Sequence, residues 1–404
     1  MNYDAIVVGA GPAGSTAARI LAQEGASVLL LDRSSFPRDK PCGGGVTLRA
    51  ASVQELDLTP VVERTVFGAR FSLRLGPSFD RRFGEPLAYM TRRSHLDTYL
   101  ARAATEAGVA FHDGDAVRGL EIAPPNGGSG SALTPAVTVR TAAGTYTADV
   151  LLGADGANGI VGRAAAIFPD FDEAVALEGN APLSTEMETR WQEILGLDLG
   201  GLAGGFGWLF PKGDHLNVGV GCWKYAAFTL RPKLSELCRR YGVDPEGLNG
   251  LRGHHLPLRV PGTPITRGPV ALMGDAAGLI DPLSGEGIHN AFASGRLAAE
   301  TALSYLAARE PDLSAYQRAV DLELQPDLTV SRQLQELFHF APPPFVAVMR
   351  QSQAFWHSFC YLIRGETTYA DFASSIGPLR LAMTFFATVA QRRRLSRLSK
   401  LAAL

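Results

Sequence analysis

Residues 4–33 read DAIVVGAGPAGSTAARILAQEGASVLLLDR, and this stretch decides the fold. Apolar runs at both ends, with helical spacing between them, predict a strand, a glycine turn, a helix and a second strand. Gly9 makes the tight turn, Gly11 admits a pyrophosphate close to the backbone, and Gly14 lets the helix pack on the strand. The helix N-terminus favours negative charge. Asp32 is expected to accept hydrogen bonds from a ribose hydroxyl pair. The residues that we expect to contact a dinucleotide are Gly9, Gly11, Pro12, Ala13, Gly14, Asp32 and Arg33.

A second glycine-rich turn lies far along the chain, where residues 270–290 read VALMGDAAGLIDPLSGEGIHN. A short apolar strand ends in a Gly-Asp pair, and the turn after it opens a helix expected over about 286–308. Asp275 is placed to bind a ribityl chain. The amides of Gly285 and Gly287 would face the pyrimidine edge of a flavin, where a helix N-terminus stabilises an anionic reduced ring. A further phosphate-binding turn is the alternative. The two turns together favour FAD over NAD, with contacts here from Gly274, Asp275, Gly285, Gly287 and Ile288.

Composition sets the broad class of protein. The chain has 404 residues, of which 46% are hydrophobic, and its net charge of −2 gives no basic surface for nucleic acid. The four cysteines (Cys42, Cys222, Cys238 and Cys360) and the eight histidines lack metal or iron–sulfur spacing, so we expect no metal site. The chain begins in a strand and holds no long apolar run. We therefore expect no signal peptide, no spanning helix, reduced cysteines and a cytoplasmic location.

The order of elements predicts an α/β protein. We expect strands within 65–82, a helix over 93–106, a hairpin from 111–122 and 137–146, and a strand over 149–152. The fold expected is a discontinuous Rossmann-type FAD-binding domain (1–75, 90–165 and 266–310), an inserted α+β substrate domain with an antiparallel sheet (76–89 and 166–265), and a helical C-terminal tail (311–404). The flavin is expected where the two domains meet.

Four further motifs carry a family resemblance. Gly153-Ala154-Asp155-Gly156 follows the strand over 149–152, and Arg93-Ser94-His95-Leu96-Asp97 opens a helix. Lys40-Pro41-Cys42-Gly43-Gly44-Gly45 follows the first βαβ unit, and Gly207-Trp208-Leu209-Phe210-Pro211-Lys212 precedes Asn217-Val218-Gly219-Val220-Gly221. With the two glycine turns, these motifs resemble the FAD-dependent oxidoreductases built on the aromatic-hydroxylase plan. Within that group the chain is most similar to the geranylgeranyl reductase family, over roughly residues 1–310. It departs from the family pattern at Asp32, Leu96, Gly159, Ala203 and Phe206.

The resemblance implies further site residues. It implies cofactor contacts from Arg93, Asp155, Gly156, Cys42, Gly43 and Gly44. It places Cys42 beside the flavin, where the thiol either donates a proton during alkene reduction or only lines the site. A small buried residue in a loop is the plain alternative. The resemblance also implies that an isoprenoid chain contacts Phe206, Trp208, Phe210, Pro211 and Gly219, although aromatic residues that alternate on a strand are often simply core.

Together these features predict an FAD-dependent reductase that saturates carbon–carbon double bonds of a geranylgeranyl-type chain on a lipid or related prenyl compound. The hydride would come from N5 of the reduced flavin, and Cys42 is the expected catalytic residue. The alternatives are an FAD-dependent monooxygenase of an aromatic or lipid substrate and a flavoprotein that carries electrons to quinone. Only one dinucleotide fingerprint is found, so NAD(P)H docks transiently or another electron donor reduces the flavin.

The C-terminal tail combines apolar and basic residues. Residues 379–390 are mostly apolar, Arg392, Arg393 and Arg394 follow, and leucines then recur at near-helical spacing. Such a helix suits a bilayer surface, although a helix docked on the protein with a solvated basic face would have the same pattern. We expect peripheral contact with the cytoplasmic face of a membrane. No feature of the sequence sets an oligomeric state.

Overall fold

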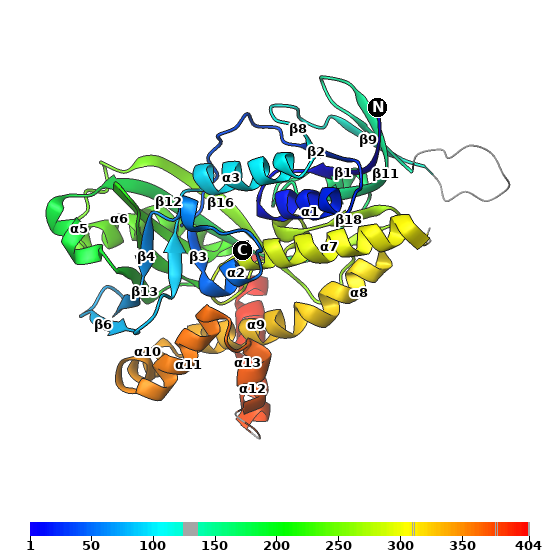
Figure 1. Ribbon diagram of the computed structural model, residues 1–404. Coiled ribbons are helices and arrows are strands. Elements are labelled where there is room, and N and C mark those ends of the chain that lie inside the picture. The colour runs from blue at the N-terminus through cyan, green and yellow to red at the C-terminus, as the bar shows by residue number, and fades with distance from the viewer. Residues whose placement is uncertain (124–135, 309, 311, 376, 378, 403–404) are drawn as a thin grey trace.

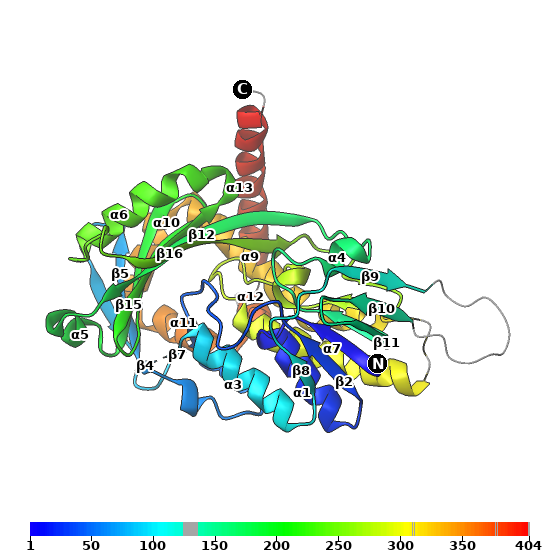
Figure 2. The ribbon, with the colours of Figure 1, turned by 90° about the horizontal axis from the view of Figure 1, so that it is seen from above.

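The computed structural model describes residues 1–123, 136–308, 310, 312–375, 377 and 379–402. Two large sheets lie side by side, and the helices that follow α7 (Ile288–Ala308) run along and beyond them (Figure 1). Figure 2 shows the same arrangement from above, with the N-terminal sheet on one side and the second sheet on the other.

The first sheet is built around the N-terminal βαβ unit. Its strands follow the order β17-β18-β11-β1-β2-β8, and β10 and β9 extend it from β11. The central pairs are parallel, whereas β9, β10 and β17 run antiparallel to their neighbours. The bounds are β1 Asn2–Val8, β2 Val28–Leu31, β8 Ala110–His112, β9 Gly119–Ile122, β10 Val137–Arg140, β11 Thr145–Gly153, β17 Thr266–Arg267 and β18 Val270–Leu272. Near-continuous apolar runs form the central strands because both faces are buried.

Three helices support the cofactor motifs on this sheet. α1 (Pro12–Gln23) packs against both α3 (Arg93–Glu106) and α7. The first helix and α3 agree with the predicted elements, and α7 begins at Ile288, at the end of the second glycine turn. The predicted hairpin is corrected in part. β8, within its first half, pairs with β2, and only β9 pairs with β10.

The second sheet has seven strands in the order β16-β12-β15-β14-β13-β5-β6. Their bounds are β5 Gly68–Leu73, β6 Phe79–Arg82, β12 Phe171–Pro182, β13 Ile194–Leu202, β14 Gly205–Pro211, β15 His215–Trp223 and β16 Asn249–Arg259. Most neighbours are antiparallel, but β5 and β13 are parallel, with Gly68 beside Ile194 and Leu73 beside Leu199. The sheet is therefore mixed, and the expectation of an antiparallel sheet is corrected at this pair.

A small sheet and several short helices join these parts. Its strands are β3 (Gly45–Thr47), β7 (Ala88–Met90) and β4 (Arg64–Val66), in that order. The short helices are α2 Leu48–Ser52, α4 Val161–Ala164, α5 Thr185–Trp191, α6 Leu230–Arg240, η1 Thr59–Val61, η2 Lys224–Thr229 and η3 Gly274–Ala277. β5 falls in the range 1–75 that we assigned to the cofactor domain, yet it pairs within the second sheet. The predicted domain boundaries stay predictions. They differ from the sheets at β5, which we assigned to the cofactor domain and which belongs to the second sheet.

The C-terminal region is helical where it is described. It contains α8 Ser314–Glu323, α9 Gln325–Phe340, α10 Pro342–Gln351, α11 Gln353–Arg364, α12 Tyr369–Ser375 and α13 Leu379–Ala402. Proline at the first helical positions of α10 separates it from α9, as the sequence predicts. α13 packs on α9 and projects beyond the body (Figure 2). Among the described residues no single helix is both long and apolar enough to cross a bilayer. α12 with residues 380–396 meets that length and composition only as a pair bent by 120°.

Candidate active site at the junction of the two sheets

The first glycine turn is shaped by steric exclusion. Gly9 has φ of +102°, and a Cβ there would lie 2.3 Å from the carbonyl oxygen of Ala154. A Cβ on Gly14 would lie 1.8 Å from the carbonyl oxygen of Gly9. α1 starts at Pro12 without any side-chain cap, which leaves its first N–H groups open to a ligand. The turn therefore has the geometry of an anion-binding helix N-terminus.

Two guanidinium groups stand beside this helix N-terminus. Arg93 donates from Nε and Nη2 to the two carboxylate oxygens of Asp97, each at 2.8 Å, and Arg38 Nη1 lies 2.8 Å from Asp97 Oδ2. A Cβ on Gly11 would lie 3.6 Å from Arg38 Nη2 and 3.7 Å from Arg93 Nη2. Burial lowers the pKa of Arg93, but Asp97 more than offsets this, so the net pKa lies above its usual value. Permanent positive charge next to open N–H groups fits a pyrophosphate.

Asp32 and Asp155 are both held by backbone N–H groups. Asp32 accepts from Ala10 N and Ser34 N, each at 2.9 Å, while Arg33 is exposed. Asp155 Oδ2 accepts from the N–H groups of Ile160 and Val161, at 2.6 and 2.9 Å. Its Oδ1 is buried without a partner among the described residues, which leaves an acceptor for a ligand. A Cβ on Gly159 would lie 2.2 Å from this carboxylate, so packing explains the glycine at that departure from the family pattern.

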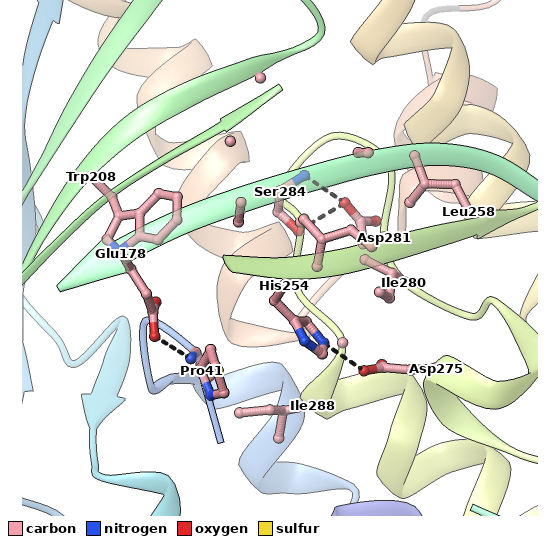
Figure 3. A pocket seen from close by; sticks show the side chains of 18 of the residues that line it. Pro41, Glu178, Trp208, His254, Leu258, Asp275, Ile280, Asp281, Ser284 and Ile288 are labelled. Atoms are coloured by element: carbon pink, nitrogen blue, oxygen red, sulfur yellow. Dashed lines mark hydrogen bonds and ion pairs between the residues drawn. The ribbon is translucent and has the colours of Figure 1, made fainter. Parts of the chain in front are cut away.

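Asp275 joins three distant segments. Lys40 Nζ lies 2.7 Å from Asp275 Oδ2, and His254 Nε2, from β16, lies 3.7 Å from the same oxygen (Figure 3). Burial raises the pKa of Asp275, but Lys40 and His254 outweigh it and hold the pKa well below its usual range. Asp275 is therefore ionised, and the second sheet contacts the second glycine turn through His254.

A central cavity of about 180 Å³ brings the predicted motifs together. Its walls come from the first turn, the Cys42 loop, α3, the second turn and the inner face of the second sheet. The predicted cofactor residues that line it are Pro12, Cys42, Arg93, Asp275, Gly285, Gly287 and Ile288. Figure 3 shows Ile288 on the opposite side of this space from Trp208 and Glu178. Pro12 of the first turn and Asp275, Gly285 and Gly287 of the second turn thus line one cavity. The predicted residues that do not line it include Gly9, Gly11, Gly14, Asp32, Asp155, Gly156 and Gly274.

An apolar cavity of about 350 Å³ adjoins the central one. One wall is the face of β5 and β13, with Ala69, Phe71 and Leu197, and the other is formed by α10, α11 and α12. The residues that line both cavities are Cys42, Phe206, Phe210, Leu283, Ser284, Gly285, Gly287 and Ile288. Cys42 therefore stands where the two spaces meet.

The predicted substrate residues fall into two groups. Phe206 and Phe210 line both cavities, and Trp208 lines the central one. Trp208 Nε1 donates to Asn217 Oδ1 at 2.7 Å, and a Cβ on Gly219 would lie 2.1 Å from its ring. Gly219 therefore makes room for Trp208. Pro211 is buried, and neither it nor Gly219 lines these two cavities.

The Cys42 turn is held by two residues that the sequence analysis did not select. Cys42 N donates to Glu178 Oε1 at 2.5 Å, and Lys212 Nζ donates to Gly43 O at 2.6 Å. Burial raises the pKa of Glu178 to about 7 and lowers the pKa of Lys212 to about 8. Lys212 ends the Phe-Pro-Lys motif, which could have marked it. For Glu178 the one signal is a lone acid in the apolar run Ala174–Gly179.

Known proteins are similar to this chain in sequence and in fold. Residues 2–185 match the FAD binding domain family. The chloroplastic geranylgeranyl diphosphate reductase of Nicotiana tabacum is 31% identical over 366 residues, which are 85% of this chain and 76% of that protein. The menaquinone reductase of Mycolicibacterium smegmatis is 32% identical over 321 residues, 74% of this chain and 75% of that protein. A geranylgeranyl bacteriochlorophyll reductase-like protein of Thermoplasma acidophilum has the same fold, with a TM-score of 0.70 and 24% identity over 83% of this chain and 87% of that one.

The fold, the charged cradle at α1 and the family match define an FAD-dependent oxidoreductase. The chain belongs to the geranylgeranyl reductase family. FAD is the cofactor that its residues fit, through the open N-terminus of α1, the two guanidinium groups beside it and the second glycine turn.

Proposed function

We propose that this protein is an FAD-dependent reductase that saturates carbon–carbon double bonds of a geranylgeranyl-type isoprenoid chain, carried by a lipid or related prenyl compound. The apolar cavity of about 350 Å³ carries the proposal, because it meets the cofactor motifs at Cys42. Its volume lies in the range of small-molecule sites, roughly 300–1,000 Å³. The names of two relatives support the substrate class, since geranylgeranyl diphosphate and menaquinone both carry isoprenoid chains.

Reduced FAD supplies the hydride for such a reaction. The protein must then hold the chain in one alignment, exclude water and provide a proton for the other alkene carbon. Phe206 and Phe210, which line both cavities, give an apolar junction that suits the first two tasks. Cys42 is half-buried at that junction and is our proposed proton donor. Its thiolate would regain a proton from water after each turnover.

Mass spectrometry of the lipid product tests the proposal. Dithionite-reduced holoprotein is incubated with geranylgeranyl diphosphate or with a menaquinone, and each saturated bond is expected to add two hydrogen atoms to the chain. Ala69→Phe fills the apolar cavity from β5 and should abolish this gain while FAD stays bound. Ala143→Phe places the same ring on an exposed turn and should leave turnover unchanged. An unaltered chain with both lipids would refute the reductase, and oxygen-coupled NADPH consumption would indicate a monooxygenase instead.

The electron donor and membrane contact are part of the same proposal. We expect either that NAD(P)H docks transiently or that another donor reduces the flavin. On α13, Leu381, Phe385 and Phe386 are 77%, 63% and 54% exposed, which supports contact with a bilayer. The three consecutive arginines of α13 differ in their surroundings. Arg392 and Arg393 are exposed, whereas Arg394 lies 2.9 Å from Glu336 and 3.2 Å from Asp172 and so belongs to the protein body.

Co-sedimentation with anionic liposomes tests the membrane contact. Phe385→Ser with Phe386→Ser is expected to release the protein from the vesicles. Phe168→Ser, at a residue 64% exposed elsewhere on the surface, should not. Equal binding by all three proteins would refute membrane contact through α13.

A further inference from the structure

The Cys42 turn is held from the second sheet at two adjacent residues, Cys42 and Gly43. Glu178, on β12, accepts from Cys42 N at 2.5 Å, and Lys212, directly after β14, donates to Gly43 O at 2.6 Å. Gly44 N points back to Cys42 Sγ at 3.3 Å. The two glycines after Cys42 leave no room for a side chain. A Cβ on Gly43 would lie 2.8 Å from the ring of Phe210, and one on Gly44 would lie 2.1 Å from the carbonyl oxygen of Thr91.

Glu178 is a buried acid without a directly paired cation. It is 8% exposed, and among the described residues no Lys, Arg or His nitrogen lies within 4.0 Å of its carboxylate. Its register partner on β16 is Arg252, which pairs instead with Asp39 at 3.2 Å, and its partner on β15 is Gly219. The charged groups that act on its pKa from the surrounding elements are Lys212, Asp39 and Arg93, and Cys42 contributes its backbone N–H. Burial outweighs the cations and raises the pKa of Glu178 to about 7.

We propose that Glu178 is the positioning residue of Cys42 and that its carboxylate holds the Cys42 peptide N–H in place. Only the expected effect of Glu178 on kcat rests on the proposed reductase activity; its hold on the Cys42 turn does not. An ionised acceptor makes a stronger hydrogen bond than a neutral one, so loss of the Glu178 proton fixes the Cys42 turn more firmly.

Alkylation of Cys42 tests the inference without any turnover. FAD-loaded protein is treated with iodoacetamide at pH 6, 7 and 8, and the modified peptide is quantified by mass spectrometry. Cys222, Cys238 and Cys360 are buried, so the signal belongs to Cys42. Glu178→Gln keeps an acceptor oxygen but removes the charge. It is expected to speed alkylation about tenfold at pH 8, because a neutral acceptor holds the Cys42 turn less firmly than an ionised one, and to have little effect at pH 6, where Glu178 is neutral in both proteins.

A matched control lies on the same strand. Glu173→Gln removes a half-exposed carboxylate that pairs with Lys224, and it should leave the Cys42 rate unchanged at every pH. In the wild type, the alkylation rate should rise less steeply above pH 7 than below it, which requires no variant. Equal rates for the wild type and Glu178→Gln at pH 8, including equally absent reaction, would overturn the inference. So would a rate ratio that is the same at all three pH values.

Steady-state kinetics then separate position from packing. Glu178→Gln is expected to keep KM for the prenyl substrate and to lose the ionisation near pH 7 from the kcat profile, whereas Glu178→Ala should lower kcat at every pH. A kcat profile that Glu178→Gln leaves intact would count against the inference. Failure of the wild type to saturate a prenyl chain, with the alkylation pattern intact, would remove the proposed function and leave the positioning role standing.

Discussion

Lys212→Met probes the cost of keeping a buried ammonium under the Cys42 turn. Lys212 is 2% exposed and has no carboxylate within ion-pair distance among the described residues. Burial lowers its pKa from the ordinary 10.5 to about 8. Each tenfold change in an equilibrium corresponds to about 1.4 kcal/mol, so this difference corresponds to about 3 kcal/mol of folding free energy lost at neutral pH.

The sign follows from proton linkage. Between pH 8 and 10.5 the unfolded chain holds the lysine proton and the folded protein does not, so the free energy of unfolding rises with pH. Below pH 8 both states are charged, and the full cost is present. Methionine has similar length and no charge, and it forfeits the hydrogen bond to Gly43 O, which is worth about 1.5–3 kcal/mol. We therefore expect the free energy of unfolding of Lys212→Met at pH 7 to equal that of the wild type or to exceed it by up to about 2 kcal/mol.

Urea unfolding with saturating FAD measures this effect. The free energy of unfolding is determined at pH 7, 8, 9 and 10 for the wild type, for Lys212→Met and for Lys233→Met, whose lysine is partly exposed on α6. Only Lys212→Met should lose the rise above pH 8, while alkene reduction falls because the Cys42 turn has lost one clamp. Destabilisation of Lys212→Met by more than about 2 kcal/mol at pH 7, or an unchanged slope above pH 8, would refute the reasoning.

Three further substitutions test the rest of the site. Gly14→Ala puts a Cβ 1.8 Å from the Gly9 carbonyl oxygen and should yield protein without flavin absorbance; full FAD content would contradict the role of this turn. Gly44→Ala forces φ of +63° on alanine, 2.1 Å from the Thr91 carbonyl oxygen, and should lower kcat while FAD remains bound; normal turnover would show that the turn tolerates displacement. Trp356→Ala empties a fully buried site and loses the bond from Nε1 to Arg82 O at 2.9 Å, so urea unfolding should report a loss of about 3–5 kcal/mol; a loss below about 1 kcal/mol would show that α11 contributes little to the fold.

The local parts of the cofactor site could be predicted from the sequence. The first βαβ unit spans about 30 residues, and its strand, turn and helix each follow from short-range rules. Gly14 is required because the nearby Gly9 carbonyl oxygen excludes a Cβ, whereas the Cβ at Gly9 is excluded by Ala154, which is far away in the chain. The Gly-Asp turn at Asp275 is similarly local. Its meeting with the first turn was expected from the order of the elements, and Pro12 is the residue of the first turn that lines the same cavity as Asp275.

The rest depended on contacts between residues far apart in the chain. The sequence of β5 has no feature that specifies a parallel partner at β13 more than a hundred residues away. In the sequence, Glu178 is a lone acid in an apolar strand, and only the fold places it against Cys42 N. The sequence pattern predicts that Arg394 contacts a membrane, but in the fold it pairs with Glu336 and Asp172. The apolar cavity likewise exists only because α10–α12 pack over the face of β5 and β13. Turns and helices are determined by interactions over a few residues. A cavity or a buried charge depends on which distant segments pack together and exclude water, and this is decided only when the whole chain packs.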